Sequence, residues 1–123
     1  MKLRIRGNSI RLRLGRGEVA ALIEGGKVEE STAFGDGQRF GYALKTSGEI
    51  TAPRASFHAG RIEVLLPTRL ARDWAASQEV GICGQQPVDT GGYLHLLIEK
   101  DFACLDSTHA GNRDTFPNPK AAC

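Results

Sequence analysis

Three side chains near the C-terminus are of the types that bind metal ions or undergo redox chemistry: Cys104, His109 and Cys123. Thiolate and imidazole are common ligands of zinc and iron, and the short interval between Cys104 and His109 permits a bend that aims both at one point. A closed metal site usually has four protein ligands, so His58, His95 or the terminal carboxylate would have to complete it. We therefore treat this segment as a candidate site for zinc or iron.

The same cysteines fit two other roles. A disulfide between Cys104 and Cys123 would close a loop of roughly 20 residues and stabilise the chain by roughly 3 kcal/mol in the loop-entropy model. In a reducing compartment that bond would be conditional and would act as a switch. Alternatively, Cys104 is a small buried side chain and Cys123 a free terminal thiol. We predict that Cys83, which follows Ile82 in an expected strand, belongs to the core.

A second group of candidate residues is basic. Residues 1–17 hold six of the sixteen basic side chains and none of the fourteen acidic ones. Guanidinium groups bind phosphate or guanine through paired hydrogen bonds, and clustered cations gain affinity by releasing counterions. The pattern indicates a nucleic-acid-binding edge, a face for a protein partner, or a solvated strand face whose charges prevent edge pairing. The candidate residues are Arg4, Arg6, Arg11 and Arg13.

The sequence carries no enzyme signature that we can identify. It has no Gly-x-Ser-x-Gly, no Gly-x-x-x-x-Gly-Lys and no His-Glu-x-x-His, which are the motifs of serine hydrolases, nucleotide-binding loops and zinc proteases. The neighbours Glu29 and Glu30 would point to opposite faces of a strand and could not share a substrate. We expect a protein that is not an enzyme and that needs no cofactor, apart from a zinc or iron ion if the C-terminal site forms.

The elements that would position these residues are strands and short helices. Apolar residues alternate with basic ones at period two over residues 3–5 and 10–14, which is typical of strands with one buried face. Residues 17–24 have apolar side chains at helical spacing and end at Gly25-Gly26, as a short helix does. Residues 28–34 and 40–44 flank Gly35-Asp36-Gly37-Gln38, a sequence typical of a hairpin turn.

This pattern recurs along the chain. Residues 5–30 align without a gap on residues 57–82, so that Ile10, Leu12 and Leu14 fall on Ile62, Val64 and Leu66. The second copy predicts strands at 56–58 and 61–66, a helix over 68–76 begun by Pro67 and buried through Leu70, Ala71 and Trp74, and strands at 80–84 and 93–99. We therefore predict an α+β fold: a mostly antiparallel β-barrel of two ββαββ repeats about a pseudo-twofold axis, with two short helices.

Composition and length fit one domain followed by a tail. We expect a single barrel domain over residues 1–100, with repeat one at 1–46 and repeat two at 53–100. Residues 101–123 form an irregular C-terminal tail that Phe102, Leu105 and Phe116 would pin to the barrel. With 41% hydrophobic and 24% charged residues, no visible secretory signal and an odd number of cysteines, we expect a cytoplasmic, non-membrane protein, monomeric or homodimeric.

A resemblance to a known family rests on Arg6-Gly7-Asn8-Ser9-Ile10-Arg11-Leu12-Arg13-Leu14, followed by a short helix and Gly26-Lys27-Val28-Glu29. This stretch resembles the opening of the AbrB/MazE swapped-hairpin family of DNA-binding antitoxins and transition-state regulators, and residues 60–82 resemble it a second time. In that family two short chains interleave into one barrel, so the resemblance implies a fused, single-chain form. It also implies DNA contacts by the four arginines.

The second copy departs from that pattern, because the four matching positions hold Ser56, His58, Glu63 and Leu65. A fused barrel would therefore have one basic edge where the family's dimer has two. As a whole, the chain also resembles small bacterial proteins without an assigned function that begin with Met-Lys-Leu-Arg-Ile and end with Glu-Lys-Asp-Phe and Phe-Pro-Asn-Pro. Three hypotheses follow: a binding module for DNA or a regulatory partner, a metal-binding or thiol-redox protein, and an accessory protein that docks its tail on another subunit.

Overall fold

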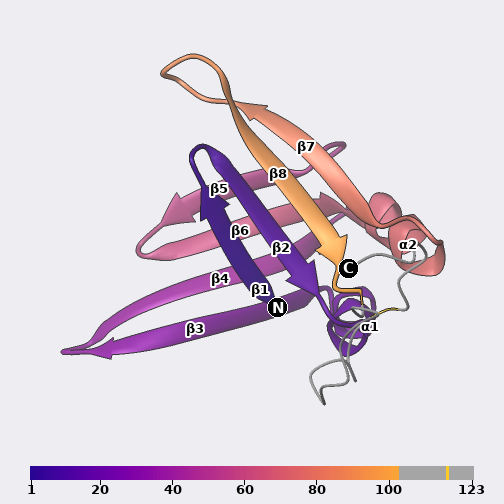
Figure 1. Ribbon diagram of the computed structural model, residues 1–123, viewed down its shortest axis with the longest axis horizontal. Coiled ribbons are helices and arrows are strands. Elements are labelled where there is room, and N and C mark those ends of the chain that lie inside the picture. The colour runs from indigo at the N-terminus through magenta and orange to yellow at the C-terminus, as the bar shows by residue number, and fades with distance from the viewer. Residues whose placement is uncertain (103–115, 117–123) are drawn as a thin grey trace.

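The computed structural model describes residues 1–102 and residue 116. In this part of the chain, strands and helices follow one another in an order that reads strand, strand, helix, strand, strand twice (Figure 1). The elements are β1 (Lys2–Arg6), β2 (Ser9–Leu14), α1 (Arg16–Gly25), β3 (Lys27–Gly35), β4 (Gln38–Ser47), β5 (Arg54–His58), β6 (Arg61–Pro67), α2 (Thr68–Ala76), β7 (Gly81–Pro87) and β8 (Tyr93–Lys100).

The strands form two four-stranded sheets. The first sheet has the order β1-β2-β8-β7 and the second β3-β4-β6-β5. Each sequential hairpin is antiparallel, whereas β2 pairs with β8 and β4 pairs with β6 in parallel. Each sheet therefore combines a hairpin from the first half of the chain with one from the second half, and both helices lie at the same end of the molecule (Figure 1). The prediction of a mostly strand α+β fold with two helices is confirmed.

The expected closed barrel is wrong. Among the described residues no backbone ladder joins one sheet to the other, and a barrel requires continuous pairing around its wall. Side chains make the junctions instead: the Gln86 amide accepts from the Ala55 N–H at 2.7 Å and donates to the Ala55 carbonyl at 2.8 Å, which ties β7 to β5. At this corner Pro53, which has no N–H to donate, lies against Gly84, where an added Cβ would be 3.0 Å from the proline ring.

The local signals in the sequence place the turns and helix ends well. Gly7 adopts a positive φ of 53° in the turn between β1 and β2, as a tight hairpin requires. Gly26 ends α1 in the left-handed conformation and donates its N–H to the Leu22 carbonyl at 2.8 Å. At the start of α1, the Glu18 carboxylate accepts the Gly15 N–H at 2.9 Å and so satisfies a donor that the helix leaves free.

The core fills the space between the two sheets and the two helices. Its largest fully buried side chain is Trp74, whose indole N–H donates to the Val80 carbonyl at 3.2 Å. Two details of α2 differ from the prediction. Leu70 is exposed, because the buried side of this helix carries Ala71 and Trp74, and Pro67 is the residue before the helix. The other fully buried large side chains are Leu12, Leu14, Leu22, Leu44, Leu66, Ile98 and Val64.

Two phenylalanines, Phe102 and Phe116, meet beside this core. Phe102 and Phe116 form a parallel bridge with their ring centres 5.9 Å apart, and Phe116 packs against the core. The buried Lys100 ammonium lies 5.3 Å from the Phe116 ring and 5.7 Å from the Trp74 ring. Burial lowers the pKa of Lys100, and the charge of Glu79 partly offsets that effect. The third predicted anchor, Leu105, lies outside the described residues.

Candidate nucleic-acid interface

The outer face of the first sheet collects the arginines that the sequence singles out. Because side chains alternate along a strand, the buried Leu12, Leu96 and Ile98 point inward and their neighbours point outward. We call this outer surface the basic face. It consists of Lys2, Arg4 and Arg6 from β1, Arg11 and Arg13 from β2, His95, Leu97 and Glu99 from β8, and Cys83 and Gln85 from β7.

The strand register arranges the basic face in rows that run across the sheet. One row, in strand order, is Arg4, Arg11, Leu97 and Cys83. The next, nearer the β1–β2 turn, is Arg6, Ser9, His95 and Gln85. The register therefore puts all four predicted arginines on one face. Because neighbouring strands lie about 4.8 Å apart, one extended ligand can reach all four.

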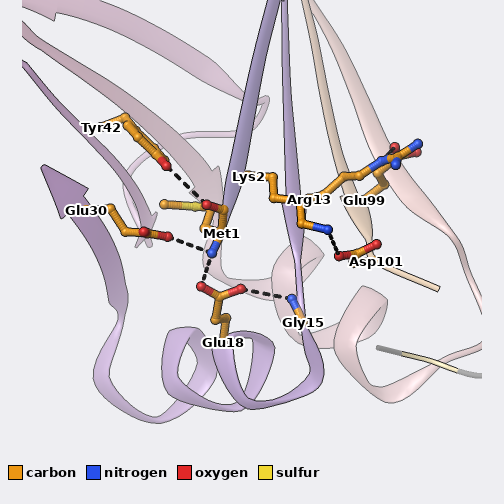
Figure 2. A network of polar contacts seen from close by, with 9 residues as sticks. All are labelled: Met1, Lys2, Arg13, Gly15, Glu18, Glu30, Tyr42, Glu99 and Asp101. Atoms are coloured by element: carbon orange, nitrogen blue, oxygen red, sulfur yellow. Dashed lines mark hydrogen bonds and ion pairs between the residues drawn. The ribbon is translucent and has the colours of Figure 1, made fainter. Parts of the chain in front are cut away.

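Acidic side chains neutralise only the end of the basic face that lies near the helices. Glu99 is buried, and its Oε1 accepts from Arg11 Nε at 2.8 Å and from Arg13 Nε at 2.7 Å. Lys2 pairs with Asp101 at 2.9 Å (Figure 2). Arg4 and Arg6 are exposed, and within the described part of the chain their side chains have no acidic partner. The free positive charge of this face is therefore concentrated at β1, toward the turn.

A shallow groove of about 810 Å³ lies over these rows. Arg4, Arg6 and Arg11 line one side of it, and Cys83, Gln85, His95 and Leu97 line the other. The prediction that Cys83 belongs to the core is wrong: the thiol is exposed and free, because the neighbouring Ile82 takes the inward position of β7. On the same side, the side chains of Gln85 and His95 approach to 3.4 Å.

Hydrogen bonds from the β1–β2 turn hold the two sides of the groove in place. The Asn8 side-chain amide donates to the Tyr93 carbonyl at 2.8 Å, and the Asn8 carbonyl accepts the His95 N–H at 3.0 Å. Asn8 therefore fixes the end of the arginine hairpin against β8. The groove is built on paired strands, which position side chains more rigidly than a loop does.

The outer face of the second sheet differs in how its charges are paired. Glu29 pairs with Arg61 and with Lys27, the latter at 3.1 Å, and these cations lower the pKa of the exposed Glu29 carboxyl, Arg61 most strongly. Glu63 pairs with Lys45 at 2.7 Å. Glu63 occupies the position that matches Arg11 in the first half of the chain, so an acid stands there in place of a base. Arg39 and Arg54 of this sheet are exposed and have no acidic partner within the described residues.

A polar network that the sequence did not predict lies beside the basic face (Figure 2). The α-ammonium group of Met1 pairs with Glu18 and, at 2.6 Å, with Glu30, while the Met1 carbonyl accepts from the Tyr42 hydroxyl at 3.1 Å. Burial raises the pKa of Tyr42, and the nearby charges of Glu30 and Glu18 raise it further. The positive charge at the centre of this network belongs to the Met1 backbone amine and not to a side chain, so no pattern of residue types could have predicted the network.

The predicted metal site cannot be placed, because Cys104, His109 and Cys123 lie outside the described residues. Among residues 1–102 and 116, no group of three or more His, Cys, Asp or Glu side chains is placed to hold a metal ion. His58 and His95, which the sequence offered as further ligands, lie on different sheets. No helix in the described part of the chain is long and apolar enough to cross a membrane.

Comparison with known proteins identifies a family and no activity. A family model described as a family of unknown function, DUF7009, matches residues 1–120. The chain belongs to the DUF7009 family. Neither the comparison with curated proteins nor the comparison with solved structures finds a significant match. The expected likeness to an uncharacterised family is therefore confirmed, whereas the likeness to swapped-hairpin proteins is not. Any function of this DUF7009 protein has to be argued from its own residues.

Proposed function

We propose that this DUF7009 protein is a non-enzymatic, cytoplasmic binding module that holds nucleic acid on its basic face. The observation that carries the proposal is the pair of exposed arginines, Arg4 and Arg6, which have no acidic partner among the described residues and border a groove. Guanidinium groups in such a position can bind phosphate oxygens and displace the counterions that surround a nucleic-acid backbone.

The distribution of charge supports nucleic acid over a nonspecific solvated surface. The second sheet pairs Arg61, Lys45 and Lys27 with carboxylates. Its two exposed arginines without an acidic partner among the described residues, Arg39 and Arg54, lie on β4 and β5, which β6 separates. On the first sheet the unpaired Arg4 and Arg6 are instead neighbours on one face of β1 and border the groove, while Glu99 holds Arg11 and Arg13 in fixed positions. This arrangement favours an anionic ligand with repeated charges.

We also propose that the fold is a duplicated ββαββ unit of the swapped-hairpin kind. The repeated order of elements, the ungapped match of residues 5–30 with 57–82 and the two parallel pairings, β2 with β8 and β4 with β6, support this view. In such a unit the hairpins of one half complete the sheets of the other. The single basic hairpin would then be a specialisation of the first copy.

Binding to an oligonucleotide of mixed sequence tests the function directly. The variant R4Q/R6Q should lose at least tenfold in affinity at low salt, because it removes about two phosphate contacts. A matched control is R39Q/R54Q, which removes the same charge from two exposed arginines of the second sheet and should bind as the unaltered protein does. If both double variants bind equally well, the basic face is not the site.

A further inference from the structure

The groove on the basic face has two chemically different halves. In strand order, the two rows under the groove begin with Arg4 or Arg6 on β1 and end with Cys83 or Gln85 on β7. Arg4 and Arg6 line the first half, and Leu97, His95, Gln85 and Cys83 line the second. Because the four strands span roughly 14 Å from β1 to β7 at the usual spacing, the halves lie side by side under one bound ligand.

The uncharged half offers what an unpaired base requires. His95 is exposed and presents an imidazole ring, Leu97 is a half-buried apolar surface, and Gln85 beside His95 carries both a donor and an acceptor. Splayed bases stack on such rings and apolar surfaces, and their Watson–Crick edges bond to amides. In a duplex these edges are already paired, and base pairing keeps them away from a sheet surface.

The arginine half points to the same ligand. A duplex presents two rows of phosphates across its grooves, whereas a single strand presents one row and leaves its bases on the other side. The free cations form one row along β1, and within the described residues the β7–β8 half has no lysine or arginine side chain facing the groove. A second phosphate row over Leu97 and Cys83 would be desolvated without a counter-charge.

We propose that the basic face binds a single strand of nucleic acid, with phosphates on Arg4 and Arg6 and bases over His95, Leu97 and Gln85. This inference rests on the proposed function and makes it more specific. It predicts that single strands bind more tightly than the same sequence as a duplex. It also assigns separate roles to the two halves, since the arginines supply the salt-dependent affinity and the uncharged half supplies the preference for unpaired bases.

The test measures fluorescence anisotropy of a labelled strand of about 12 nucleotides, alone and annealed to its complement. We expect the single strand to bind at least fivefold more tightly than the duplex. The variant H95A/Q85A changes two exposed side chains and should lower single-strand affinity about fivefold or more while leaving duplex affinity and the dependence on salt unchanged. R39Q/R54Q again serves as the control for general effects.

A second readout locates the strand. Alkylation of the exposed Cys83 thiol, followed by peptide-resolved mass spectrometry to separate it from Cys104 and Cys123, should slow severalfold in the presence of the single strand. Duplex affinity equal to single-strand affinity, or an unprotected Cys83, would overturn the single-strand inference and leave the proposed function standing if R4Q/R6Q still weakens binding. Failure of both oligonucleotides to bind would overturn both proposals.

Discussion

The α-ammonium group of Met1 lies between two carboxylates at the point where β1 approaches the second sheet (Figure 2). Burial alone would lower the pKa of this group, but its bonds to Glu18 and Glu30 outweigh burial and raise the pKa above the ordinary value of 8.0. A folded-state pKa above the unfolded value means that the charge stabilises the fold fully below about pH 8 and loses that effect as pH rises through the raised pKa.

Acetylation of the Met1 amine should therefore destabilise the protein. At pH 7 we expect the free energy of unfolding to fall by about 1–2 kcal/mol, since charge-assisted bonds are lost and both carboxylates are partly exposed. The difference between free and acetylated chains should shrink as pH rises above about 8. Urea unfolding of both forms at several pH values measures it. Equal stabilities at pH 7 would show that the ammonium group contributes nothing.

Glu99 is the residue that limits the free charge of the basic face. The variant E99Q should lower the free energy of unfolding by about 1–2 kcal/mol, because Arg11 and Arg13 lose their shared carboxylate. It should also tighten oligonucleotide binding severalfold, because two further cations become free. The matched control is E63Q, which removes the partner of Lys45 on the second sheet and should leave binding unchanged. Weaker binding by a folded E99Q variant would contradict this account.

At the scale of elements, β7 and β8 approach each other closely where Gly81 pairs with Glu99. Gly81 makes this possible: an added Cβ would be 2.8 Å from the Ile98 carbonyl oxygen and 3.1 Å from the Glu99 Cβ. Backbone atoms cannot move aside as the end of a flexible side chain can. A substitution there must shift β7 away from β8 and disturb the uncharged half of the groove.

The variant G81A should accordingly lower the free energy of unfolding by about 1–3 kcal/mol, the range found for overpacking. Gly25 gives a matched control, since an added Cβ there would meet nothing within 4 Å. G25A should be neutral or slightly stabilising, because it reduces the freedom of the unfolded chain. Denaturant unfolding of both variants decides the point, and a G81A variant as stable as G25A would refute the close approach.

The same elements show how far sequence reasoning reaches. Local signals predict the turn at Gly7-Asn8 and the end of α1 at Gly26, because positive φ values and capping depend on neighbouring residues alone. The parallel pairings of β2 with β8 and β4 with β6 join residues far apart in the chain, and no local pattern encodes them. The prediction of which β7 side chains point inward was wrong at Cys83 for a related reason. Both Ile82 and Cys83 are residue types that are often buried, and only the packing of the whole sheet decides between them.

The candidate site was predicted in the same partial way. Period-two alternation places Arg4, Arg6, Arg11 and Arg13 on one face, and the register of β1 with β2 agrees with that placement. The pairing of Arg11 and Arg13 with Glu99, and the uncharged half contributed by β7 and β8, depend on long-range register. The sequence therefore predicted where the free charge lies but missed what neutralises part of it.

For the whole molecule, the exchange of hairpins between the halves makes neither sheet complete without both. We therefore expect unfolding in one cooperative step, even though the same order of elements occurs twice along the chain. Trp74 is the only tryptophan in the sequence and is buried in the core, so its fluorescence reports tertiary packing, whereas circular dichroism reports the strands. The two transitions should coincide in urea. Two separated transitions would mean that the halves fold independently.

The measurement that tests the central claim most directly is the dependence of oligonucleotide affinity on salt. For a single strand, the slope of log affinity against log salt is about −0.7 for each phosphate neutralised. Between about 50 and 200 mM salt, R4Q/R6Q should lower the magnitude of this slope by about 1.4, while R39Q/R54Q leaves it unchanged. An unaltered slope in R4Q/R6Q, or no binding by the unaltered protein at low salt, would contradict nucleic-acid binding at the basic face.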